Sequence, residues 1–67
     1  MALAVDARGM RCPWPALRLA RAMRDAGPGA TVRLLADDPA APREVAALAA
    51  QHGWQVEEDG EALIVTG

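Results

Sequence analysis

The chain has 67 residues, which is enough for one domain, residues 1–67, with a thin core. It contains no Phe and no Tyr, so Leu, Val, Met, Ala and the two Trp must fill that core, and a deep internal substrate cavity is disfavoured. The net charge of −2 disfavours non-specific nucleic-acid binding, and no apolar run or N-terminal leader suggests a membrane or secretion. We expect a cytoplasmic protein whose active site lies on the surface.

The first half of the chain predicts a strand, a loop and a helix. Residues 2–6 alternate between Ala and larger apolar side chains, which predicts a strand. A loop follows, in which Gly9 supplies backbone freedom. Residues 12–15 contain two prolines, which fit a helix entrance better than a helix interior. Residues 16–26 then repeat apolar side chains at helical spacing, and residues 27–29, Gly-Pro-Gly, end the helix.

The second half predicts two β-α-β passes and a hairpin. The expected elements are a strand over residues 31–36, a helix from Pro42 to the residue before Gly53, a strand from Trp54 and a strand over residues 63–66. Asp37-Asp38-Pro39 ends the first of these strands, and Asp59-Gly60 predicts a two-residue hairpin. The element order is therefore β-α-β-α-β-β. It predicts an α/β (α+β) two-layer sandwich, with a four-stranded mixed sheet and two helices on one face.

Cys12 is the residue most suited to chemistry. As the one Cys of the sequence it forms no internal disulfide and builds no multi-Cys zinc site, and we expect neither a metal nor a cofactor. At the start of a helix, the unpaired N–H groups and the helix dipole favour an anion. Arg11 is adjacent, and we expect Arg8 and Arg18 to lie close. These positive groups are expected to lower the pKa of the thiol and to keep it ionised.

Little else in the sequence supplies catalytic machinery. The one His, His52, falls at the far end of the second predicted helix, out of reach of the thiol, and no second Cys is present to resolve a disulfide. A rigid Pro13-Trp14-Pro15 segment would hold the sulfur at one exposed place. The pattern indicates a thiol that accepts and donates a group while partners supply the acid–base chemistry. Whether such half-reactions make the chain an enzyme stays open.

Two segments of the sequence resemble a known family. The first reads Val5-Asp6-Ala7-Arg8-Gly9-Met10-Arg11-Cys12-Pro13-Trp14-Pro15, and the second reads Asp37-Asp38-Pro39 followed by Arg43. An apolar residue and Asp, then Gly, then Cys-Pro-x-Pro at this spacing is similar to the motif of the TusA/SirA-like family of small sulfur carriers. The resemblance covers essentially the whole chain, and the order of elements agrees.

The resemblance implies a fold similar to the C-terminal domain of a bacterial translation initiation factor, and a persulfide on Cys12. It also implies a sulfur donor, either a cysteine desulfurase or a rhodanese, and an acceptor protein in tRNA thiolation, molybdenum-cofactor maturation or sulfur oxidation. The positions that match the motif around the cysteine are Asp6, Gly9, Arg11, Pro13 and Pro15. Trp14 departs from it, since this position is often acidic in relatives, and the difference bears on partner choice.

A second group of residues is a candidate for partner docking. It consists of Trp14, Arg18, Arg21, Asp37 and Asp38. The simpler alternatives are a solvated helix face for the arginines and turn or capping residues for the two acids. We expect a monomer with protein partners and no direct contact with nucleic acid or membrane.

Two other functions remain open. A thiol-based redox sensor would form a sulfenic acid with peroxide. A regulatory or nucleic-acid interaction module would contain Cys12 as a structural residue, as isolated cysteines often are. A C-terminal thiocarboxylate carrier is excluded because the chain ends Val65-Thr66-Gly67, with one Gly directly after a predicted strand.

Overall fold

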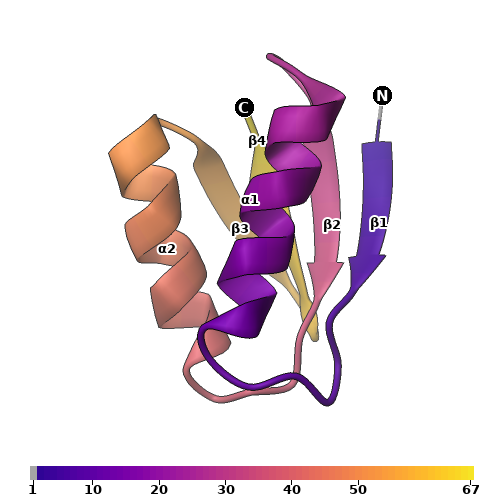
Figure 1. The fold of residues 1–67 in the computed structure, drawn as a ribbon, viewed down its shortest axis with the longest axis vertical. Coiled ribbons are helices and arrows are strands. Elements are labelled where there is room, and N and C mark those ends of the chain that lie inside the picture. Colours follow the sequence, from indigo (N-terminus) through magenta and orange to yellow (C-terminus); the bar gives the residue numbers. More distant parts are fainter. Residues whose placement is uncertain (1) are drawn as a thin grey trace.

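The architecture, seen in a computed structural model that describes residues 2–67, is a mixed sheet covered by two helices on one face (Figure 1). Its elements are β1 (Ala2–Asp6), α1 (Trp14–Ala26), β2 (Thr31–Leu35), α2 (Ala41–His52), β3 (Gln55–Asp59) and β4 (Ala62–Thr66). The fold class and element order predicted from the sequence are confirmed.

The strands lie in the order β1-β2-β4-β3. β1 and β2 are parallel, with Val5 opposite Leu34, and α1 crosses over the sheet between them. β4 lies between β2 and β3 and is antiparallel to both. β2 and β3 are therefore parallel to each other but separated by the last strand, so that β2-α2-β3 is a split β-α-β unit.

The side chains of β3 and β4 explain why the last strand occupies the interior of the sheet. β4 buries Ala62, Leu63 and Val65 and has no charged residue. β3 reads Gln-Val-Glu-Glu-Asp and is exposed at every position except Val56. An edge strand rich in charge resists pairing with other chains, whereas an apolar strand gains most from two neighbours. Gly60 has a φ of 60°, which suits the first central position of the two-residue hairpin between them.

The helix boundaries differ slightly from the sequence expectations. α1 begins at Trp14, two residues before the expected start at Ala16, since Pro13 serves as the N-cap and Pro15 is tolerated in the first turn. α2 begins at Ala41, one residue before Pro42, because a proline is also tolerated in the first turn of this helix. Gly53 ends α2 in the left-handed conformation, with a φ of 74°.

The core lies between the sheet and the helices. Pro15, Leu19 and Met23 recur at a spacing of four and are the buried side chains of α1, and Val45 is the largest fully buried side chain of α2. They pack against the inward residues of the two central strands, Val32, Leu34, Leu63 and Val65. Burial of these side chains orients α1, and this orientation places its N-terminal end beside the carboxyl ends of β1 and β2.

A pair of leucines on α1 tests this account of the core. Leu19 is fully buried and Leu17 is 52% exposed. Leu19→Ala should lower the free energy of unfolding by about 2–5 kcal/mol, because it leaves a cavity in a small core. Leu17→Ala should change it by less than about 0.5 kcal/mol. Urea unfolding followed by circular dichroism measures both. Equal effects of the two variants would contradict the assigned orientation of α1.

Candidate functional site

Cys12 lies in the loop of residues 7–13 that joins β1 to α1, and it is exposed. It precedes Pro13, the N-cap of α1, to which it is joined by a cis peptide bond. An exposed thiol contributes nothing to the core. The alternative in which Cys12 is a buried structural residue is therefore contradicted by the structure.

The loop that follows β2 lies against the Cys12 loop. Because β1 and β2 are parallel neighbours, their carboxyl ends meet at the same edge of the sheet. The Ala7 amide donates to the Leu35 carbonyl at 2.7 Å and extends the ladder by one step. The two loops are thereby held side by side, and the cysteine loop has the second loop's polar groups within reach.

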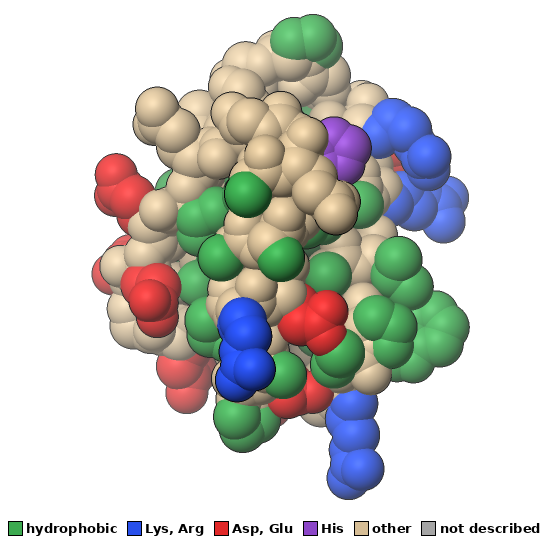
Figure 2. Space-filling view, turned by 90° about the vertical axis from the view of Figure 1, so that its left-hand side faces the viewer, with side chains coloured by type: hydrophobic (Ala, Val, Ile, Leu, Met, Phe, Trp, Pro, Cys, Tyr) green, Lys and Arg blue, Asp and Glu red, His purple; other side chains and the backbone are tan. Residues whose placement is uncertain are grey.

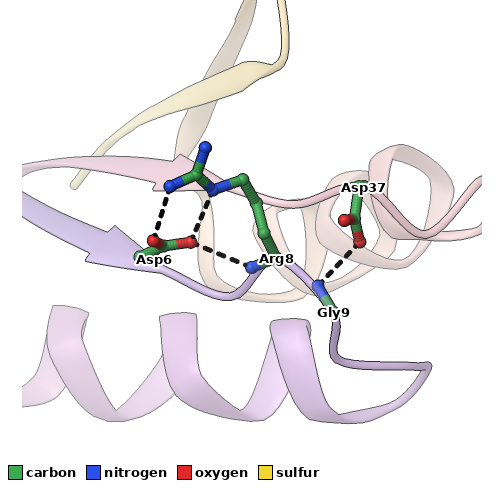
Figure 3. Close-up of polar contacts among 4 residues, drawn as sticks. All are labelled: Asp6, Arg8, Gly9 and Asp37. Carbon is green, nitrogen blue, oxygen red and sulfur yellow. Dashed lines mark hydrogen bonds and ion pairs between the residues drawn. The ribbon is translucent and has the colours of Figure 1, made fainter.

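Asp37 and Asp38 bind the cysteine loop through its backbone. The Gly9 amide donates to Asp37 Oδ1 at 2.9 Å (Figure 3). The Cys12 amide donates to Asp38 Oδ2 at 2.8 Å, while Asp38 Oδ1 accepts from the Ala40 amide at 2.9 Å. Asp38 is therefore a turn residue, as the sequence suggests, but it is also a direct neighbour of Cys12. The sequence analysis missed this link, which the parallel pairing of β1 and β2 together with the Asp-Asp-Pro segment could have indicated.

Asp6 and Arg8 form a bidentate ion pair at the start of the same loop. Asp6 Oδ1 accepts from Arg8 Nε at 3.0 Å, and Asp6 Oδ2 accepts from the other guanidinium nitrogen at 2.9 Å (Figure 3). Chiefly through this side-chain hydrogen bond, Arg8 lowers the pKa of Asp6 from 3.8 to about 2, and Asp6 in turn raises the pKa of Arg8. The expectation that Arg8 supports the thiol is thus wrong, because its charge is matched by Asp6.

The first turn of α1 offers fewer N–H donors to the sulfur than the sequence analysis assumed. Pro13 and Pro15 have no N–H group, and the Trp14 amide donates to the Arg11 carbonyl at 2.8 Å. In the part of the chain that the structure describes, Ala16 alone among the first helical positions keeps an amide without an acceptor. The helix end therefore acts on the thiol mainly through its dipole, together with the adjacent, exposed Arg11.

An exposed apolar and basic stripe on α1 begins two residues after Cys12. Trp14 and Leu17 are 60% and 52% exposed, and Arg18 and Arg21 continue the same face at a spacing of i, i+3, i+4 and i+7. We call these four residues the α1 stripe. Figure 2 shows hydrophobic side chains protruding on the right of that view between basic ones, with acidic side chains gathered on the left. Arg18 and Val5 of β1 line the same surface pocket, and the charge of Arg18 adds a minor part to the lowering of the pKa of Asp6.

His52 lies at the opposite end of the molecule from Cys12. It ends α2, while Asp38 and the cysteine loop lie at the other end of that helix (Figure 1). Its ring stacks on Trp54 with centroids 4.4 Å apart. The structure thus separates the one imidazole from the thiol, as the sequence analysis expects.

Two further features, a metal-binding cluster and a membrane-spanning helix, are not found in the described residues 2–67. No group of three or more His, Cys, Asp or Glu side chains in this range is arranged to hold a metal ion. None of the helices in the same range has the length and apolar character needed to cross a membrane.

Comparisons with known proteins identify a family and a solved structure of similar fold. The family model described as sulfurtransferase TusA matches residues 4–66. A crystal structure of a SirA-like protein from Desulfitobacterium hafniense is similar, with a TM-score of 0.78 and 30% sequence identity. The match covers 98% of this chain and 93% of that one, so it extends over all the elements described above.

The Asp6–Arg8 pair makes stability depend on pH in a defined window. Because folding lowers the pKa of Asp6 from 3.8 to about 2, the contribution of its charge is present above pH 3.8 and is lost as the pH falls through about 2. Asp6→Asn keeps a side-chain oxygen for the Arg8 amide but removes the charge. The variant should melt below the wild type at pH 7, and the difference should shrink toward zero near pH 2. Melting curves across this range decide it; a difference independent of pH would contradict the assignment.

Proposed function

The chain belongs to the TusA family of sulfurtransferases, and on that premise we propose that it carries sulfane sulfur as a persulfide on Cys12 and relays it to an acceptor protein. Family membership supports a general role between sulfur donors and acceptors. The observation that supports the finer statement is the geometry at Cys12. The thiol is exposed, it lies two residues before the helix that carries the α1 stripe, and the one imidazole of the chain lies at the far end of the fold.

Each step of the proposed reaction requires no group beyond Cys12 and the reacting group of one partner protein. The Cys12 thiolate attacks the outer sulfur of a persulfide on the donor, so that a new S–S bond forms on Cys12. The S–S bond of the donor breaks, and the donor leaves as a thiolate. In the second step a nucleophile of the acceptor attacks the outer sulfur, and the Cys12 thiolate leaves. Oxidation state is exchanged between the partners at each step, so neither an external oxidant nor a reductant is needed.

The environment of the sulfur favours an anion to a limited degree. Arg11 and the N-terminal end of α1 provide positive potential, and both act in favour of the thiolate and the persulfide anion. The carboxylates of Asp37 and Asp38 oppose them from the neighbouring loop. A moderately activated thiol suits a carrier, since it must also serve as a leaving group when the sulfur is passed on.

The α1 stripe is the proposed docking surface for partners. Its first turn is apolar and exposed, and its second turn is basic, so a complementary partner would present an apolar pocket bordered by acidic side chains. A cysteine desulfurase or a rhodanese with such a surface is the proposed donor. The proposed acceptor belongs to tRNA thiolation, molybdenum-cofactor maturation or sulfur oxidation. A carrier with one thiol works as a monomer, and the cytoplasm keeps that thiol reduced.

The main test is loading of the thiol. Incubation with a cysteine desulfurase and free cysteine should add the mass of one sulfur atom to the wild-type chain and none to Cys12→Ser. Intact-mass spectrometry measures the adduct, and treatment with a reductant should remove it. Absence of an adduct with cysteine desulfurases and rhodaneses alike would refute the carrier. If no donor gives an adduct and peroxide converts Cys12 to a sulfenic acid, the redox-sensor function is favoured.

The docking surface is tested by kinetics of transfer. Trp14→Ala should reduce kcat/KM for loading about tenfold, because an exposed aromatic anchor is lost without damage to the core. Arg18→Gln should reduce it a few-fold and weaken its dependence on salt. Arg24→Gln, at the other end of the same helix, is the control with the same change in charge. Equal rates for Arg18→Gln and Arg24→Gln would leave the basic part of the stripe as a solvated face.

A further inference from the structure

The Asp38 carboxylate links the two loops at the site with both of its oxygens. Oδ1 accepts from the Ala40 amide at 2.9 Å, which closes the turn that leads into α2. Oδ2 accepts from the Cys12 amide at 2.8 Å. The carboxylate is fixed by its own turn and by the fold of α2, so it is a rigid acceptor. Asp38 is partly buried, whereas Cys12 is exposed.

The backbone at Cys12 is held on both sides. On its amino side the N–H group is bound by Asp38. On its carboxyl side Pro13 has a fixed φ, and the Trp14 amide donates to the Arg11 carbonyl across the residue. Rotation about the Cα–Cβ bond is the main freedom left to the thiol. The Asp38 carboxylate is therefore the side chain that completes the restraint on the backbone that carries the sulfur.

We propose that Asp38 is a positioning residue for sulfur transfer, which holds the exposed Cys12 sulfur in the direction from which a partner's sulfur is attacked. The proposal rests on the proposed function and adds to it the residue that orients the reacting group. Asp38 touches neither substrate nor the reacting atoms and acts through the Cys12 amide. Loss of that bond frees the backbone dihedral angles of Cys12. The entropy cost of fixing them again for transfer corresponds to a loss in loading rate on the order of tenfold.

Asp37 provides a matched control on the adjacent position. Its carboxylate accepts from Gly9 with Oδ1 alone. An Asn at position 37 can supply that one acceptor, whereas an Asn at position 38 has one oxygen for two N–H donors. Asp37→Asn and Asp38→Asn each remove one negative charge from the same loop. A difference between them therefore measures the loss of one of the two hydrogen bonds of Asp38 and not the charge, and the NMR signal of the Cys12 amide shows whether the bond to Cys12 is the one lost.

The charge effect and the positioning effect also have opposite signs. Removing a carboxylate near the thiol favours the thiolate, so alkylation of Cys12 by iodoacetamide should keep its rate or increase in both variants. A small reagent approaches from many directions and needs no fixed sulfur. Loading by a protein donor needs one direction, and it should slow down more in Asp38→Asn than in Asp37→Asn.

The experiment compares wild type, Asp37→Asn, Asp38→Asn and Asp38→Ala in the full chain. Steady-state loading by a cysteine desulfurase gives kcat and KM at one pH, and 15N–1H NMR follows the Cys12 amide. Both Asp38 variants should lower kcat on the order of tenfold with little change in KM. Their Cys12 amide should shift and exchange faster with solvent, and in Asp37→Asn both the kinetic change and the change at this amide should be smaller. Melting curves show which variants are folded. If Asp38→Ala is unfolded, Asp38→Asn alone provides the test.

Three outcomes would overturn the positioning role while the carrier function stands. One is normal loading by folded Asp38→Asn, and another is an equal loss in Asp37→Asn. The third is a rise in KM at constant kcat, which would make Asp38 a docking residue. Failure of wild type to load with any donor is the separate result that removes the carrier function, and the positioning role with it.

Discussion

The parallel pairing of β1 with β2 is the constraint on which the site depends. It brings the carboxyl ends of both strands to one edge, so that residues 7–13 and residues 36–40 leave the sheet side by side. The Ala7–Leu35 hydrogen bond continues the pairing beyond the strands. The cysteine loop is consequently built against a neighbour that is distant in sequence, and its conformation is a tertiary property. The burial of Leu19 and Met23 then directs α1 away from this edge over the sheet.

The two carboxylates at this edge solve a problem that the loop itself creates. A tight connection into a helix that begins with two prolines leaves the amides of Gly9 and Cys12 without a partner in regular structure. Asp37 and Asp38 satisfy them and so bring two carboxylates to the cysteine loop. If Cys12 reacts as an anion, as the proposed function requires, these charges oppose its ionisation while the hydrogen bonds order the backbone beside it.

Much of the fold follows from local signals, whereas the contacts of the site do not. Gly-Pro-Gly at residues 27–29 and Gly53 fix where the helices end, and the apolar spacing fixes the type of each element. The Asp59-Gly60 pair locates the hairpin to within one residue, because Asp59 ends β3 and the turn is Gly60-Glu61. The interior place of β4 was also readable, because its neighbour β3 carries three acids. Asp38 was assigned its local turn but not its bond to Cys12, since that bond needs the register of two strands. Arg8 was placed by proximity in sequence, and only the side-chain geometry shows that Asp6 takes its charge.

The neutralisation of Arg8 has a consequence for how a partner recognises this surface. Of the basic residues near the motif, Arg8 is tied to Asp6, and Arg11 is the one beside the sulfur. Of the other five arginines of the sequence, Arg18, Arg21 and Arg24 are on α1, Arg33 is on β2 and Arg43 is on α2. Arg21 forms only a long, exposed pair with Asp25 at 3.8 Å. On the proposed docking role of the α1 stripe, the charges of Arg18 and Arg21 would attract an acidic partner, and Trp14 and Leu17 would provide the apolar fit. Because α1 begins two residues after Cys12, a partner docked along this helix would lie next to the thiol.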